Sequence, residues 1–135
     1  MEASLEWRGG LRFDAEVGSG GPLAFDNVDE GTPAGPSPME ALLTSLAACT
    51  AMDVISILEK KRQKVTSYRV EIEADRDPKG TWPRPFKAFR IKHVVTGEVD
   101  EAALERAISL SEEKYCSVSA TLKTTPSITN TWVIE

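Results

Sequence analysis

The segment 37–62 constrains the fold of this chain more than any other part of the sequence. It opens with Ser-Pro-Met-Glu at positions 37–40, the pattern of a capping box with proline in the first helical turn. It closes with three basic residues at positions 60–62, which suit the negative end of a helix dipole. Between positions 41 and 58 the only charged residue is Asp53. A segment that is apolar nearly all round predicts a long central helix that is buried rather than lying on a surface.

A membrane-spanning helix is the alternative for this segment, because about 20 apolar residues suffice to cross a bilayer. Several small or polar side chains within it argue against a membrane: Thr44, Ser45, Cys49, Thr50, Asp53 and Ser56. The flanking segments also have the strand patterns of a soluble domain. We therefore expect no membrane partner.

The length of 135 residues predicts a single domain over residues 1–135. A chain of this size has too little mass to cover a long buried helix on all sides, so a second subunit is expected. The net charge of −5 offers no basic surface for nucleic acid. The chain has two cysteines, and its N-terminus lacks the pattern of a signal or transit peptide. Both observations indicate a reducing compartment, which we take to be the cytoplasm.

The remaining segments predict an α+β fold in the order βββ–α–ββ–α–α–β. Gly9-Gly10 is the signal for a two-residue hairpin turn between the first two strands. In the two long strands apolar residues alternate with charged ones, as expected when one sheet face is covered. The expected strands cover residues 3–8, 11–17, 22–26, 66–77, 86–96 and 128–135. The expected later helices cover residues 100–115, with Asp100 as the cap, and 116–123.

The two cysteines, Cys49 and Cys116, are too far apart for a CxxC redox or zinc spacing, so only the fold could bring them together. Cys49 is expected in mid-helix with Asp53 one turn further on, and a carboxylate opposes the ionisation of a neighbouring thiol. A reactive Cys49 therefore needs a cation from elsewhere. Cys116 is expected at a helix start, where the dipole favours a thiolate. On local physics alone Cys116 is the more reactive thiol, and two inert buried cysteines are the alternative.

His93 is the only histidine and lies on the apolar face of a predicted strand, which favours a structural core histidine over a catalytic one. A metal site of Cys49, His93 and Cys116 has suitable ligand types but no supporting sequence spacing. Asp53 is an isolated charge in an apolar helix, where a carboxylate is normally paired. Structural and functional roles for Asp53 both remain open.

Three stretches of the chain resemble the OsmC / organic hydroperoxide resistance family. They are the helix start at positions 37–43, the Ala-Ala-Cys-Thr-Ala-Met-Asp-Val stretch around Cys49, and the Ser-Glu-Glu-Lys-Tyr-Cys-Ser-Val stretch that ends beyond Cys116. The resemblance covers essentially the whole chain and is greatest to the YhfA-like branch, whose activity is less defined. It implies an OsmC-like fold, in which an intertwined homodimer wraps two long central helices in antiparallel sheets from both chains.

In the peroxidase branches of this family, a cysteine in the central helix attacks the peroxide and becomes a sulfenic acid. A second cysteine condenses with it to a disulfide, which an external dithiol reduces. The resemblance therefore implies Cys49 as the peroxidatic residue and Cys116 as the resolving residue, contrary to the local ranking. It also implies oxidative-stress defence, with a small organic hydroperoxide or hydrogen peroxide as substrate and with no metal or organic cofactor.

The chain departs from the family pattern in the groups that activate the thiolate. The peroxidase branches use an arginine from the N-terminal strands, held by a glutamate at the start of the central helix. No Arg or Lys occurs from position 13 to 59, and neither Arg12 nor Arg8 clearly matches the family arginine. Glu40 lies nine residues before Cys49, on the opposite helix face, so we hypothesise that it serves Cys49 of the other subunit. The alternative is a non-catalytic dimer that binds a small ligand at the subunit interface.

Overall fold

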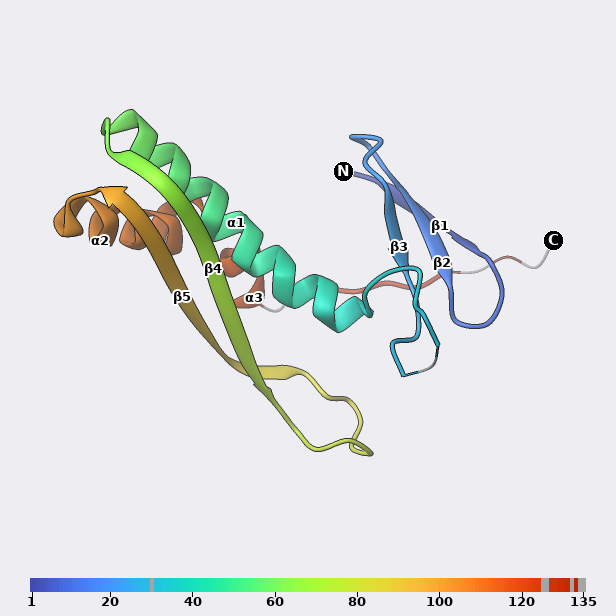
Figure 1. Ribbon diagram of the computed structural model, residues 1–135. Helices are drawn as coiled ribbons and strands as arrows, with labels where there is room; N and C mark the ends of the chain where they lie inside the picture. The colour runs from blue at the N-terminus through green and yellow to red at the C-terminus, as the bar shows by residue number, and fades with distance from the viewer. Residues whose placement is uncertain (30, 125–126, 132, 134–135) are drawn as a thin grey trace. The chain divides into compact units, whose positions relative to one another are not determined.

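The computed structural model describes residues 1–29, 31–124, 127–131 and 133. Its elements follow the order β1, β2, β3, α1, β4, β5, α2, η1 and α3, where η1 is a π-helical turn (Figure 1). The predicted α+β class is therefore confirmed, with a long helix and antiparallel sheets. The chain forms two compact units, Met1–Thr44 and Ser45–Glu135.

The first unit contains a three-stranded antiparallel sheet of β1 (Ala3–Trp7), β2 (Phe13–Val17) and β3 (Leu23–Phe25). The predicted hairpin between β1 and β2 is confirmed, but its turn is longer than the two residues expected. The amide of Arg8 donates to the carbonyl of Arg12 at 3.0 Å, so the turn also includes Leu11. The φ angles of Gly9 (+101°) and Gly10 (+56°) explain why glycines occupy this turn.

Helix α1 (Pro38–Lys60) begins and ends close to the predicted positions. At its start, the Ser37 hydroxyl accepts from the Glu40 amide at 3.3 Å, and the Glu40 carboxylate accepts from the Ser37 amide at 3.2 Å. This arrangement confirms the capping box. At its end, Arg62 has a φ of +56° and the Gln63 amide donates to the carbonyl of Leu58 at 2.9 Å. The helix therefore ends in a Schellman motif.

Full burial along α1 is confined to one stripe, with Leu46, Thr50, Val54 and Leu58 spaced four residues apart. Within the single chain the helix is not covered on all sides, because Met52 on another face is 70% exposed. Its burial with the help of a second subunit stays a prediction. A single chain of this size has too little mass to cover the remaining faces. By length and composition alone α1 could also cross a membrane, a criterion that core helices of soluble proteins also meet.

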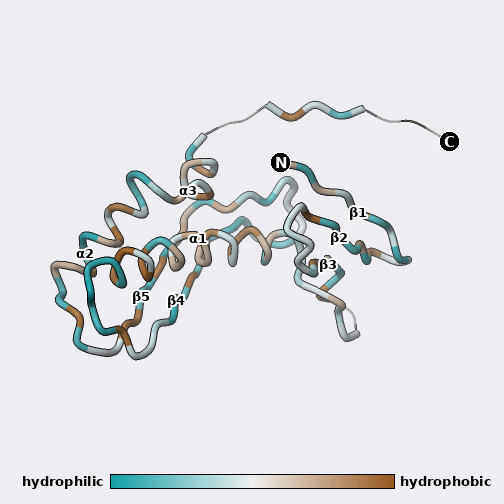
Figure 2. Tube along the Cα trace, turned by 90° about the horizontal axis from the view of Figure 1, so that it is seen from above, coloured by the Kyte–Doolittle hydropathy of each residue, from teal (hydrophilic) through white to brown (hydrophobic). Residues whose placement is uncertain are grey.

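The second unit contains a long hairpin of β4 (Lys64–Arg76) and β5 (Phe86–Glu98), which lies beside α1 (Figure 1). Val70 pairs with His93 and Ile72 pairs with Ile91, so the apolar residues of both strands share one face, as predicted. The other face carries exposed ion pairs such as Arg90–Asp75. The alternation of hydrophobic and hydrophilic residues along these strands is visible in Figure 2.

Helix α2 (Glu101–Leu110) continues into η1 (Ser111–Tyr115) and is followed by α3 (Ser117–Leu122), in agreement with the predicted helices. Asp100 is the N-cap residue of α2, but its side chain makes no capping hydrogen bond. Ala107 packs with Val54 and Leu58 of α1 to form the core. The predicted last strand, 128–135, falls partly outside the described residues, and residues 127–131 and 133 form no strand.

Candidate active site

The two cysteines come together in the second unit. Cys49 lies on α1 and Cys116 is the N-cap residue of α3. Their sulfur atoms and a carboxylate oxygen of Asp53 all lie within 4.8 Å of one another. Cys116 is 3% exposed, whereas Cys49 and Asp53 are half-buried. The fold thus brings together three of the residues singled out from the sequence.

The π-helical turn η1 positions Cys116. The amide of Cys116 donates to the carbonyl of Ser111 at 2.8 Å, five residues back, which is the wider spacing of a π-helix. The backbone of Cys116 is then extended, with φ −71° and ψ 99°, so the chain leaves the α2 direction at the cysteine. The amide of Ser119 donates to the Cys116 sulfur at 3.3 Å and fixes the thiol at the start of α3.

A buried hydroxyl connects this turn to the central helix. The Ser111 hydroxyl is fully buried and lies 2.9 Å from Asp53 Oδ2 and 3.0 Å from Thr50 Oγ1. A hydroxyl carries one proton and a carboxylate only accepts, so Ser111 donates to Asp53 and Thr50 supplies the other proton. The sequence alone assigns Ser111 no role at the site. A serine on the buried side of an amphipathic helix is the signal that could have indicated a buried polar partner.

The electrostatic surroundings keep Cys116 protonated. Burial is the main cause that raises the pKa of the Cys116 thiol, and the Ser119 amide opposes it. The pKa of Cys116 is raised further by the hydrogen bond with Cys49, by the negative charge of an ionised Cys49 and by the negative charge of Asp53. The expectation that the helix start favours a thiolate at Cys116 is therefore wrong, because burial and neighbouring charge outweigh the start of a short helix. Cys116 is suited to hold a proton beside Cys49.

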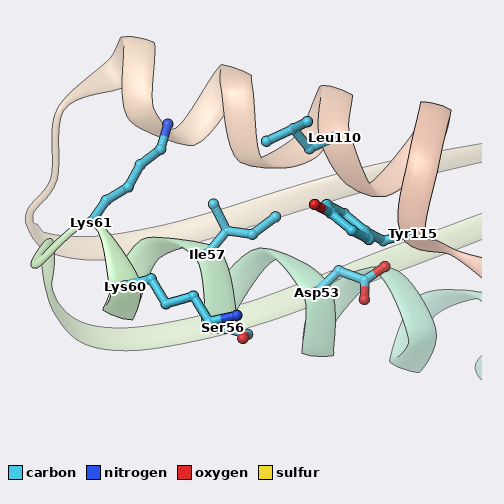
Figure 3. Close-up of a pocket in the computed structure, with 7 residues that line it drawn as sticks. All are labelled: Asp53, Ser56, Ile57, Lys60, Lys61, Leu110 and Tyr115. Carbon is cyan, nitrogen blue, oxygen red and sulfur yellow. The ribbon is translucent and has the colours of Figure 1, made fainter.

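Two cavities in the second unit border this cluster. The smaller, of ≈ 380 Å³, is lined by Asp53, Ile57, Leu110 and Tyr115, with Lys60 and Lys61 at the end away from Tyr115 (Figure 3). The larger, of ≈ 530 Å³, includes Cys116, Ser111 and Thr50. Its apolar lining comes from the following residues: Leu46, Phe86, Phe89, Ile91, Ile108 and Leu122. Small molecules therefore have space next to Asp53 and next to Cys116.

His93 lines the larger cavity and its Nδ1 lies 2.7 Å from the Tyr68 hydroxyl. Burial lowers the pKa of His93 and raises the pKa of Tyr68 to about 12. Both groups are therefore neutral near pH 7, and they share one hydrogen bond whose direction depends on the imidazole tautomer. The structural role of His93 stays a prediction.

The other candidates from the sequence have partners within the first unit. Arg12 and Arg8 both bind the Asp14 carboxylate, at 3.0 and 3.1 Å, and hold the pKa of Asp14 below its usual value. Glu40 accepts hydrogen bonds from the amide and the hydroxyl of Ser37. Each of these contacts is exposed, so it leaves the side chain accessible to another chain.

This fold with a pair of facing thiols defines the class of the protein. A family model described as OsmC-like protein matches residues 30–131, and the chain belongs to the OsmC-like family. The chain is 38% identical over 135 residues to Protein YhfA of Escherichia coli K12, covering 99% of this chain and 98% of that relative. The resemblance to the family and to this branch is thereby confirmed.

Solved structures agree with this assignment. A hypothetical protein from Aquifex aeolicus VF5 is 36% identical with a TM-score of 0.79, over 90% of this chain and 86% of that chain. An OsmC-like hydroperoxide resistance protein from Jannaschia sp. CCS1 is 19% identical with a TM-score of 0.60, over 96% of this chain and 89% of that chain. At that identity the second structure shows a shared fold.

Proposed function

We propose that this protein is a thiol-dependent hydroperoxide reductase, with Cys49 as the peroxidatic and Cys116 as the resolving cysteine. The observation that carries this proposal is the separation of the two sulfur atoms, at most 4.8 Å within one chain. A modest side-chain rotation brings two thiols at that distance to the 2.05 Å of a disulfide. The family, and the hydroperoxide resistance named for the Jannaschia relative, support a peroxide as substrate.

The reaction uses two thiols and one peroxide. The Cys49 thiolate attacks the hydroxyl oxygen of ROOH, the O–O bond breaks, and Cys49 becomes a sulfenic acid. The alkoxide RO⁻ leaves and takes a proton from the Cys116 thiol, which gives ROH. The Cys116 sulfur attacks the sulfenic sulfur, and water leaves as the disulfide forms. An external dithiol then exchanges with this disulfide, returns two electrons and restores both thiols. The burial that keeps Cys116 protonated places a proton donor beside the reacting Cys49.

The activating groups are the second part of the proposal. Asp53 opposes ionisation of the thiols, so a cation is needed at the site. We assign this task to a second copy of the chain, because α1 exposes Met52 and buries only one stripe. Arg12 and Glu40 are the groups of the other subunit proposed to reach Cys49, and they keep accessible side chains. The working form is then a homodimer of one OsmC-like domain over residues 1–135, acting in the cytoplasm in oxidative-stress defence.

The test starts with reduced protein and one equivalent of cumene hydroperoxide. Peroxide loss is followed over time, and the Cys49–Cys116 disulfide is identified by mass spectrometry. Cys49→Ser is expected to abolish rapid consumption, because it removes the nucleophile. Cys116→Ser is expected to retain one turnover and to leave a sulfenic acid that a sulfenic-specific probe labels. Slow oxidation that does not saturate in the wild-type protein would contradict a peroxidase.

A non-catalytic, ligand-binding protein is the second candidate, favoured by the apolar cavity of ≈ 530 Å³ beside Cys116. In that case Cys49→Ser and Cys116→Ser leave peroxide kinetics unchanged. Ligand affinity then changes with apolar substitutions such as Phe89→Ala, because this residue lines the cavity. The same peroxide experiment therefore separates the two functions.

A further inference from the structure

We propose that Cys49, Cys116 and Asp53 in the reduced protein form a binding site for a thiophilic divalent metal ion, with Zn²⁺ as the best match. Each residue offers one ligand atom, and these atoms lie within 4.8 Å of one another. Two sulfur atoms bound to one tetrahedral zinc ion at about 2.3 Å are about 3.8 Å apart. The side chains therefore need to close by roughly 1 Å to complete a three-residue site.

The contacts around these residues already orient them for a metal. Cys49 and Asp53 lie four residues apart on α1, so their side chains lie on the same helix face. The Ser111 hydroxyl binds Oδ2 of Asp53 at 2.9 Å, which leaves Oδ1 for a metal. The Ser119 amide donates to the Cys116 sulfur at 3.3 Å. Outer contacts of this kind fix ligand orientation in protein metal sites.

The ligand types select the metal. Two thiolates favour Zn²⁺, Cd²⁺ and Co²⁺ over Mg²⁺ and Ca²⁺, which require oxygen ligands. Three protein ligands leave a fourth position for water, as in open zinc sites. The cavity bordering Asp53 and the cavity bordering Cys116 supply space for that water.

Metal binding and disulfide formation exclude each other, because both use the same two sulfur atoms. Binding displaces the thiol protons, and oxidation of the two thiolates to a disulfide removes two electrons and two ligands, so the ion is released. The site itself does not depend on the proposed peroxidase activity. Its test uses reduced protein without peroxide, and a thiol-oxidising diazene supplies the disulfide form.

The experiment titrates the reduced, metal-free, full-length protein with Co²⁺ and follows thiolate-to-cobalt charge-transfer absorption. Zn²⁺ affinity is then measured by displacement of the cobalt. We expect one equivalent per chain, no competition by excess Mg²⁺, and loss of the absorption after diazene oxidation. We expect Asp53→Asn to weaken metal binding roughly tenfold or more, which is the loss of affinity typical of a perturbed metal site. Glu105→Gln, which changes an exposed carboxylate on α2, is the control and keeps wild-type affinity.

Two results would overturn the proposal. One is the absence of saturable binding to the reduced wild-type protein, or equal binding to its oxidised form. The other is unchanged affinity in Asp53→Asn together with a large loss in His93→Gln, which would assign the third ligand to the histidine. Circular dichroism of each variant confirms that it is folded, and the oxidised wild-type protein tests the thiols without any substitution.

Discussion

Removing the Ser111 hydroxyl tests how the π-helical turn is held against the central helix. Ser111 is fully buried, donates to Asp53 Oδ2 at 2.9 Å and accepts from Thr50 at 3.0 Å. Ser111→Ala keeps the Cβ atom, so it creates little new cavity. It does remove the donor to a carboxylate and leaves the Thr50 hydroxyl, which is 7% exposed, without this partner.

The size of the effect follows from the type of hydrogen bond lost. A hydrogen bond to a charged group contributes about 1.5–3 kcal/mol. Asp53 is only half-buried, so water replaces part of the interaction, while the buried Thr50 hydroxyl adds to the loss. We expect Ser111→Ala to lower the free energy of unfolding by about 2 kcal/mol. In a domain of this size, that corresponds to a fall in Tm of roughly 7 °C.

The measurement is urea unfolding under reducing conditions, followed by tryptophan fluorescence at a fixed protein concentration. The matched control is Ser109→Ala near the end of α2, whose hydroxyl makes an exposed contact with Glu113 at 3.3 Å. That variant is expected to stay within about 0.5 kcal/mol of the wild-type protein. If Ser111→Ala also stays within that range, the buried hydroxyl does not hold the turn and the reasoning is refuted.

Substitutions at two further residues test the helix start and the partner of His93. Glu40→Ala should lower the free energy of unfolding by about 1 kcal/mol because it removes the capping box, whereas Glu40→Gln keeps the cap. Slower peroxide consumption by Glu40→Gln at unchanged Tm would support the cross-subunit role of Glu40. Unchanged kinetics would exclude that role. Burial raises the pKa of Tyr68 to about 12 in the folded protein, whereas the phenol of the unfolded chain ionises near pH 10. The folded state therefore loses stability as the pH rises from about 10 towards 12. Tyr68→Phe should abolish this loss in thermal scans across that range, and a decline identical to that of the wild-type protein would contradict it.

The parts of the fold that were predicted correctly depend on local patterns. The capping box and the basic end of α1 act within a few residues, so the bounds of the helix follow from the sequence. The alternation in β4 and β5 predicts which residues share a face, and the pairing of Val70 with His93 confirms it. The hairpin turn at Gly9 was less well predicted, because glycines permit several turn lengths.

The site itself depends on contacts between distant segments. The proximity of Cys49 and Cys116 requires the π-helical turn, and no local pattern in the segment 111–115 predicts a π-helix. The raised pKa of Cys116 comes mainly from burial, which a helix-start argument does not include. The order of the two cysteines that the resemblance implies stays a prediction, and the resemblance does not identify the cation that activates Cys49.

The need for a cation follows from the geometry of the cluster. Two unit charges 4.8 Å apart repel by about 3.5 kcal/mol at an effective dielectric constant of about 20. If both thiols and Asp53 ionise, three such pairs oppose the folded state by about 10 kcal/mol. The cluster therefore keeps a proton, as on Cys116, or gains a positive charge. An arginine from a second subunit leaves the sulfur of Cys49 free to attack peroxide, whereas a bound metal ion occupies both sulfurs. Zinc should therefore inhibit peroxide consumption in proportion to its occupancy, and full activity at saturating zinc would show that the two chemistries use different atoms.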